Sequence, residues 1–231
     1  MSDIFQLPPY PSVPLQGEDA RFPVRRIFCV ARNYEAHARE MGGSPDRSAP
    51  VYFTKTPWAI CHSGETIPYP PVTANCHYET ELVVAIGGDA FRIGEAEALS
   101  VVFGYACGFD LTRRDLQNAS RDQGRPWDTG KDFENSAVVG SITRADAFGA
   151  IGSQRIGMTQ NGKVKQDGHL TELIWSVPEL IADLSRFYHL APGDLIYTGT
   201  PAGVGPIAPG DRLVGSVDGL EPVELTIGPA E

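Results

Sequence analysis

Glycine and proline interrupt this chain so often that few long regular elements are expected. The 231 residues include 25 glycines and 19 prolines, which typically bend or end short segments. The strand-like runs between them do not alternate regularly with helices, and this argues against a doubly wound parallel sheet. We therefore expect a mostly β fold with a few helices, of the α+β class.

Apolar periodicity predicts where the main elements lie. The expected strands are residues 24–30, 51–54, 77–87 and 101–109. The expected helices are residues 34–41, the first part of 112–134, and 176–189. Asn33 is expected to cap the first of these helices.

The chain is expected to form one domain preceded by an arm. Residues 1–22 hold four prolines among polar residues, which predicts an extended arm on the surface or on a partner subunit. No linker divides the remainder, so residues 23–231 are expected to form a single domain.

Composition excludes several classes of function. The net charge of −10 argues against nucleic acid or an anionic membrane as the main partner. No signal-like start is present, and no apolar run approaches the about 20 residues of a membrane-spanning helix. We expect a cytoplasmic protein that acts on a small molecule. Its four cysteines contain no Cys-x-x-Cys pair and are expected to be buried free thiols.

Three acidic residues predict a metal site. Glu79 and Glu81 lie two apart in the strand 77–87, so their carboxylates share one face. Such charges repel unless a hard divalent cation binds them. Asp110 ends the strand 101–109 and could supply a third oxygen ligand. An exposed strand edge for the glutamates and a helix cap for Asp110 remain alternatives.

A histidine–glutamate pair could activate water. His37 and Glu40 lie three apart in the helix 34–41 and share a face, so Glu40 could orient the imidazole as a general base. A surface ion pair is the alternative. The flanking glycines 42–43 would suit a helix that closes over a site.

Further side chains could hold a substrate carboxylate or an oxyanion. The basic candidates are Lys55, Arg113, Arg114 and Lys131. The glycine-rich loop 192–205 lets backbone approach a ligand, with Thr200 as a hydrogen-bond donor.

Together these segments resemble the fumarylacetoacetate hydrolase family, over nearly everything after about residue 24. The matching motifs are Ala31-Arg32-Asn33-Tyr34 with His37, Phe53-Thr54-Lys55, His77-Tyr78-Glu79-Thr80-Glu81-Leu82, residues 108–117, Trp127 with Lys131, Asn161-Gly162, and residues 192–205. Within the family the chain looks closest to acylpyruvate hydrolases of the fumarylpyruvate type, which act in gentisate breakdown. The departures are small: Ala31 stands where glycine is usual, Tyr78 where a second histidine is usual, and Thr56 where lysine is common.

The resemblance implies a roll of mixed β-sheets, paired as a homodimer, in which residues 23–231 form the catalytic domain. It implies that Glu79, Glu81 and Asp110 bind one Mg²⁺ or Mn²⁺. It also implies that His37 and Glu40 activate water and that Lys131 steadies an oxyanion. The residues implied to position the substrate are Arg32, Tyr34, Lys55, Gln117 and Thr200.

The implied reaction is metal-dependent hydrolysis of the carbon–carbon bond of an acylpyruvate, with fumarylpyruvate giving fumarate and pyruvate. Two alternatives stay open. The same site could decarboxylate or isomerise an oxaloacetate-like 2-oxo acid, or the chain could bind a ligand without turnover. Neither the acyl group nor the choice between Mg²⁺ and Mn²⁺ follows from the sequence.

Overall fold

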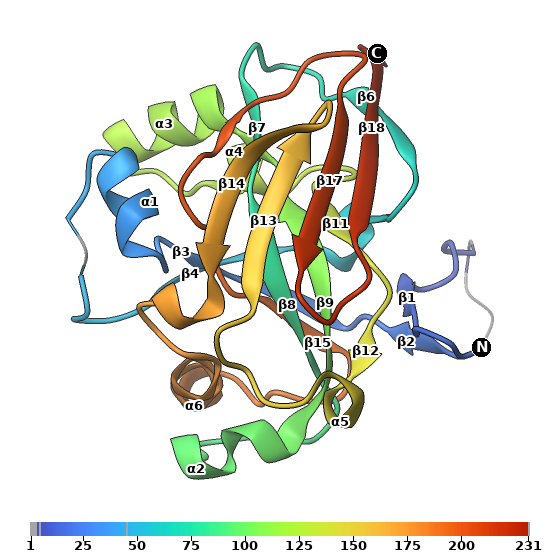
Figure 1. Ribbon diagram of the computed structural model, residues 1–231, viewed down its shortest axis with the longest axis vertical. Helices are drawn as coiled ribbons and strands as arrows, with labels where there is room; N and C mark the ends of the chain where they lie inside the picture. Colours follow the sequence, from blue (N-terminus) through green and yellow to red (C-terminus); the bar gives the residue numbers. More distant parts are fainter. Residues whose placement is uncertain (1–3, 5, 45, 231) are drawn as a thin grey trace.

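The computed structural model describes residues 4, 6–44 and 46–230, which form two large sheets with smaller sheets and short helices around them (Figure 1). The predicted fold class, mostly strands with a few helices, is confirmed. Residues 1–3 and 5 of the expected arm, and residue 231, lie outside the described residues. Among the described helices, none is long and apolar enough to cross a membrane.

The larger sheet has eight strands and two buried faces. Seven of them, in spatial order, are β4 (Val51–Lys55), β3 (Arg26–Ala31), β15 (Asp194–Tyr197), β8 (Thr80–Ile86), β9 (Val102–Asp110), β11 (Ala137–Val139) and β5 (Ile60–His62). The eighth, β12 (Thr143–Arg144), also pairs with β9 but lies off this path. Side chains alternate along a strand, so Leu82 and Val84 enter one apolar core while Val83 and Ala85 enter another. Burial on both faces explains why residues 82–86 of β8 are all apolar.

A second sheet covers one of these faces. Its five strands in spatial order are β14 (Lys163–His169), β13 (Arg155–Gln160), β17 (Arg212–Val217), β18 (Val223–Ala230) and β6 (Thr66–Tyr69). Ile156, Leu213 and Leu225 of this sheet share the larger core with Leu82 and Phe109. Figure 1 shows β13 and β17 passing in front of β8 and β9.

Two small sheets complete the strands. One is β10 (Thr112–Arg113), β7 (Cys76–Tyr78) and β16 (Gly205–Pro206), and the other is the pair β1 (Ser12–Pro14) and β2 (Arg21–Pro23). In place of the extended arm that we predicted for 1–22, its second half forms this hairpin. Val13 and Phe22 face one another across it and are buried in the smaller core. Burial of these two apolar side chains holds the segment against the domain.

The helices are short and lie at the margins of the sheets. They are α1 (Glu35–Glu40), α2 (Glu95–Ala98), α3 (Arg114–Asp122), α4 (Asp128–Lys131), α5 (Ala145–Phe148), α6 (Val177–Phe187) and the 3-10 turns η1 (Pro57–Ala59), η2 (Leu99–Val101) and η3 (Leu170–Glu172). Helix α6 begins with a capping box between Ser176 and Glu179.

The Asn33 side chain and the four cysteines were also predicted from the sequence. The predicted cap of α1 is wrong: the Asn33 amide donates instead to the carbonyl oxygens of Trp175 and Thr198 at 2.9 and 2.8 Å. This side chain ties the start of α1 to two distant loops. All four cysteines are buried and free, as predicted.

Candidate active site

Three carboxylates meet where the chain passes from one sheet to another. The predicted strand 77–87 is interrupted at Glu79, because β7 belongs to the three-stranded sheet and β8 to the eight-stranded one. Asp110 ends β9, the antiparallel neighbour of β8, and its backbone N–H donates to the Glu79 carbonyl oxygen at 2.8 Å. One carboxylate oxygen each of Glu79, Glu81 and Asp110 lies within 4.8 Å of the other two. The predicted convergence of these residues is confirmed.

The donor set fits a hard divalent cation. Glu79, Glu81 and Asp110 are buried, with 4%, 2% and 1% of their surface exposed, so the exposed strand edge considered for the glutamates is excluded. The helix cap considered for Asp110 is excluded too, because α3 begins at Arg114. Burial, with the charges of Asp110 and Glu79, raises the pKa of Glu81 well above its ordinary value. An all-oxygen site of this charge is the type that Mg²⁺ and Mn²⁺ occupy.

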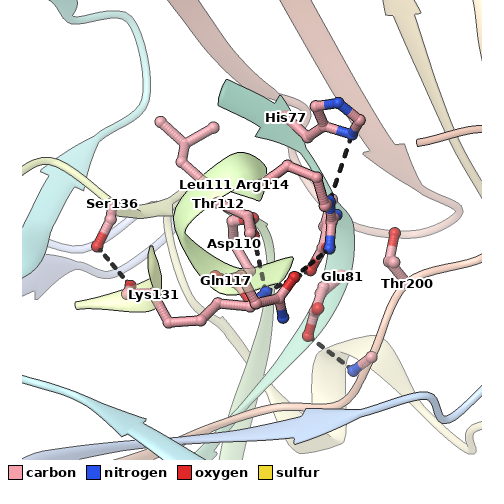
Figure 2. Close-up of polar contacts among 12 residues, drawn as sticks. His77, Glu81, Asp110, Leu111, Thr112, Arg114, Gln117, Lys131, Ser136 and Thr200 are labelled. Atoms are coloured by element: carbon pink, nitrogen blue, oxygen red, sulfur yellow. Dashed lines mark hydrogen bonds and ion pairs between the residues drawn. The ribbon is translucent and has the colours of Figure 1, made fainter. Parts of the chain in front are cut away.

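Lys131 reaches into the triad from α4. Its Nζ lies 2.7 Å from Glu79 Oε2, 2.6 Å from Asp110 Oδ2 and 2.7 Å from the Thr112 hydroxyl (Figure 2). Burial would lower the pKa of Lys131, but Asp110 and Glu79 outweigh it and raise the value. The ammonium is therefore held charged against the carboxylates.

Arg114 approaches Glu79 from the first residue of α3. Its guanidinium pairs with Glu79 and donates to Gln117 Oε1 at 2.6 Å (Figure 2). Burial acts to raise the pKa of Glu79, yet Lys131 and Arg114 together hold it well below its ordinary range. Sequence reasoning named Arg114 only as one of several basic candidates, because only the fold brings it to Glu79.

Lys55 and Tyr34 are buried and do not line the cavity next to Glu79 and Glu81. Lys55 Nζ lies 2.9 Å from Asp110 Oδ1 and donates to the carbonyl oxygens of Leu111 and Lys131. Its side chain is fully buried, so it neutralises Asp110 from within the protein. Tyr34 is 1% exposed, and burial raises the pKa of its hydroxyl.

A cavity of about 460 Å³ is lined by Glu79 and Glu81, while Asp110 lies behind them and is not among the lining residues. The predicted site residues that line it are Arg32, His37, Glu79, Glu81, Gln117, Lys131 and Thr200. The other lining residues are Val30, Ala31, Met41, Gly42, Gly43, Phe53, Arg114, Arg121 and Trp127. Of these, Arg114 was predicted as a basic candidate, whereas Arg121 was not. The cavity is thus lined by both acidic and basic side chains and by the aromatic side chains of Phe53 and Trp127.

His37 of α1 lines this cavity, and Glu40, which is not among the lining residues, holds His37 from behind. His37 Nδ1 lies 3.0 Å from Glu40 Oε2, and the other Glu40 oxygen accepts the Gly203 backbone N–H at 3.0 Å. His37 is only 5% exposed, so the surface ion pair considered earlier is excluded. Because Nδ1 must donate to the carboxylate, Nε2 is the nitrogen free to accept a proton.

The loop between β15 and β16 supports the site with backbone and a hydroxyl. Gly199 N–H donates to Glu81 Oε2 at 2.7 Å, from a φ of +100° that favours glycine. The Thr200 hydroxyl accepts from Gln166 Nε2 at 2.7 Å. Gln166 is buried on β14, and sequence reasoning missed it because polar residues surround it in the chain.

Comparison with known proteins now identifies the chain. The model of the fumarylacetoacetate (FAA) hydrolase C-terminal family matches residues 26–228. The chain belongs to the fumarylacetoacetate hydrolase family. It is 51% identical to a fumarylpyruvate hydrolase of a Ralstonia species over 193 residues, which are 83% of this chain and all of that protein. It is 35% identical to an oxaloacetate tautomerase of Escherichia coli over 205 residues, 88% of this chain and 93% of that one.

A solved family member has nearly the same fold. The crystal structure of fumarylpyruvate hydrolase from Pseudomonas aeruginosa with Mn²⁺ and pyruvate is 43% identical to this chain. Its TM-score is 0.95, over 99% of this chain and all of that one. The predicted family and the predicted class, a hydrolase of carbon–carbon bonds, are confirmed by these matches. The predicted cation site is confirmed by the geometry of the triad, and Mn²⁺ in the neighbour is one of the two ions predicted.

Proposed function

We propose that this chain hydrolyses fumarylpyruvate, an acylpyruvate, to fumarate and pyruvate with Mg²⁺ or Mn²⁺, as a step of gentisate breakdown. One observation carries the proposal: His37, oriented by Glu40, lines the same cavity as Glu79 and Glu81 of the carboxylate triad. The 51% identity to a fumarylpyruvate hydrolase supports the choice of acyl group.

His37 would act as the general base. Its Nε2 accepts a proton from water while the water oxygen bonds to the acyl carbonyl carbon of the substrate. The bond from that carbon to the pyruvate methylene then breaks, and its electron pair leaves with pyruvate. The proton held by His37 returns to that methylene carbon, so the reaction consumes one water and releases two acids.

Arg114 and Lys131, which line the cavity, would help to bind and orient the pyruvate end. The carboxylates Glu79, Glu81 and Asp110 are matched by three cations, which are Lys55, Arg114 and Lys131. When bound, the divalent cation would supply two further positive charges for the carboxylate and 2-oxo group of the substrate. This local excess of positive charge suits the binding of an anionic substrate, although the protein as a whole is acidic. Thr200 and Gln117 line the same cavity as hydrogen-bonding groups.

The proposal also includes a homodimer, a cytoplasmic location, and a single catalytic domain over residues 23–231. The homodimer follows from the family resemblance. The single domain is supported by a core cluster that joins strands of both large sheets.

The test is turnover of fumarylpyruvate by the purified chain, followed by loss of the ultraviolet absorbance of the diketo acid. We expect one fumarate and one pyruvate per substrate, loss of activity in EDTA, and recovery on adding Mn²⁺ or Mg²⁺. Undiminished turnover in EDTA, or no fumarate among the products, would contradict the proposal.

A second candidate is isomerisation or decarboxylation of an oxaloacetate-like acid on the same site. The 35% identity to an oxaloacetate tautomerase favours it. Neither reaction adds water to a carbonyl carbon, so a base that activates water is not required. The His37–Glu40 pair therefore favours hydrolysis, and counting fumarate, enol and CO₂ from matched substrates distinguishes the reactions.

A further inference from the structure

Two exposed arginines of the cavity, Arg32 and Arg121, are left without a task by the proposed reaction. Arg121 lines the cavity near the end of α3 and is exposed. Its guanidinium lies 3.1 Å from the carboxylate of Asp122, its neighbour in the chain. An exposed pair of this kind contributes little free energy, so a ligand carboxylate could replace Asp122 at small cost.

Helix α3 places Arg121 at a defined distance from the carboxylate triad. Arg114, Gln117 and Arg121 are spaced by three and four residues, so they share one face of the helix. All three line the cavity. At the rise of an α-helix, Arg121 lies about 10 Å along the axis from Arg114. Arg114 marks the metal end, and Arg121 therefore marks the far end.

The two ends of an extended acylpyruvate match the two ends of this cavity. Its carboxylate and 2-oxo group belong at the triad, so its acyl chain points away from Arg114 along α3. A fumaryl chain is flat, conjugated and ends in a second carboxylate. Phe53 and Trp127 line the same cavity, with ring centroids 6.1 Å apart and ring planes inclined by 55°, and each offers an apolar aromatic surface for such a chain. A guanidinium can bind a terminal carboxylate through two parallel hydrogen bonds.

We propose that Arg121 binds the terminal carboxylate of the acyl chain and so selects acylpyruvates with an acidic acyl group. The inference rests on the proposed hydrolysis of acylpyruvates and names the substrate class of that site. Two other exposed arginines are rivals. Arg32 lines the same cavity from the end of β3, and Arg125 lines an adjoining hollow of about 390 Å³. Only Arg121 shares a helix face with Arg114 and Gln117.

The experiment compares two substrates, fumarylpyruvate and the neutral acetylpyruvate. For Arg121→Gln we expect kcat/KM for fumarylpyruvate to fall about tenfold to hundredfold, mainly through a higher KM. We expect kcat/KM for acetylpyruvate to stay unchanged, which also shows that the variant is folded. The matched control is Arg39→Gln, an exposed helical arginine paired with Glu35 outside the cavity, which should change neither value.

The outcomes separate this inference from the proposed function. If Arg121→Gln keeps the wild-type preference between the two substrates, the inference fails while the hydrolysis stands. If Arg32→Gln or Arg125→Gln loses the preference and Arg121→Gln does not, the carboxylate is bound elsewhere and the inference is overturned. If the wild-type chain cleaves neither acylpyruvate, the proposed function fails and the inference fails with it.

Discussion

At the scale of single residues, the site depends on which nitrogen of His37 is free. Replacing His37 by alanine removes the proton acceptor but leaves the three carboxylates and their cations in place. We expect kcat on fumarylpyruvate to fall by at least ~10²-fold, the lower size of general-base effects, with little change in KM. Steady-state kinetics at saturating Mn²⁺ would measure both.

The chain offers a closely matched control for this variant. His62 Nδ1 lies 3.0 Å from Glu65 Oε1, also three residues away, and this pair lies outside the cavity. His62→Ala therefore removes the same kind of contact, together with the contacts of His62 Nε2 to Ser12 and Arg21. It leaves the site untouched, and kcat should not change. Equal losses in His37→Ala and His62→Ala would show that the effect is structural and would remove His37 from its proposed role.

Residue types and short spacings were enough to predict part of the site. Glu79 and Glu81 are two residues apart in a predicted strand, and His37 and Glu40 are three residues apart in a predicted helix. Local geometry therefore predicts that each pair shares a face. Lys55 could not be placed in this way. Its contact with Asp110 depends on the order of strands in the eight-stranded sheet, and a lysine at a strand end has the same local pattern whether buried or exposed.

At the scale of elements, one loop holds two parts of the site. The segment between β15 and β16 gives the Gly199 N–H to Glu81 and the Gly203 N–H to Glu40. A Cβ on Gly199 would lie 2.7 Å from the Asn33 Cβ, so the backbone must shift. We expect Gly199→Ala to move the donor away from Glu81 and weaken Mn²⁺ binding, measured by titration calorimetry.

A second glycine isolates the effect of backbone strain. Gly210 has a φ of +93°, close to the +100° of Gly199, but a Cβ there meets no atom within 4 Å. Each substitution should cost about 1–2 kcal/mol of folding free energy through its φ alone. Mn²⁺ affinity should fall only in Gly199→Ala. The same loss of affinity in Gly210→Ala would mean that general destabilisation, and not the Glu81 contact, is responsible.

Element boundaries show what local patterns miss. The run 77–87 is predicted as one strand because neither glycine nor proline interrupts it before residue 87, yet the chain changes sheets at Glu79. The hairpin β1–β2 is not predicted from the sequence, because prolines at positions 8, 9, 11 and 14 are typical of an extended arm. In both cases the pairing partners lie outside the segment, and a short sequence window does not contain them.

At the scale of the whole molecule, the carboxylate triad joins structures that fold together. Glu79 lies between two sheets, Glu81 belongs to β8, and Asp110 ends β9. The strands that carry them pack in the same core as the five-stranded sheet. A ligand that binds this triad only in the folded chain should therefore stabilise the whole proposed domain, and not one part of it.

This coupling gives a prediction for thermal unfolding. At free Mn²⁺ one hundred times its dissociation constant, the folded state should gain about 2.7 kcal/mol, which corresponds to a midpoint higher by about 5–10 °C. Calorimetry should show one transition that moves as a whole. Glu81→Gln can still accept the Gly199 N–H but lacks the charge, so its midpoint should move much less. An equal shift in Glu81→Gln would place the bound Mn²⁺ away from the triad, and two transitions that respond separately would contradict a single domain.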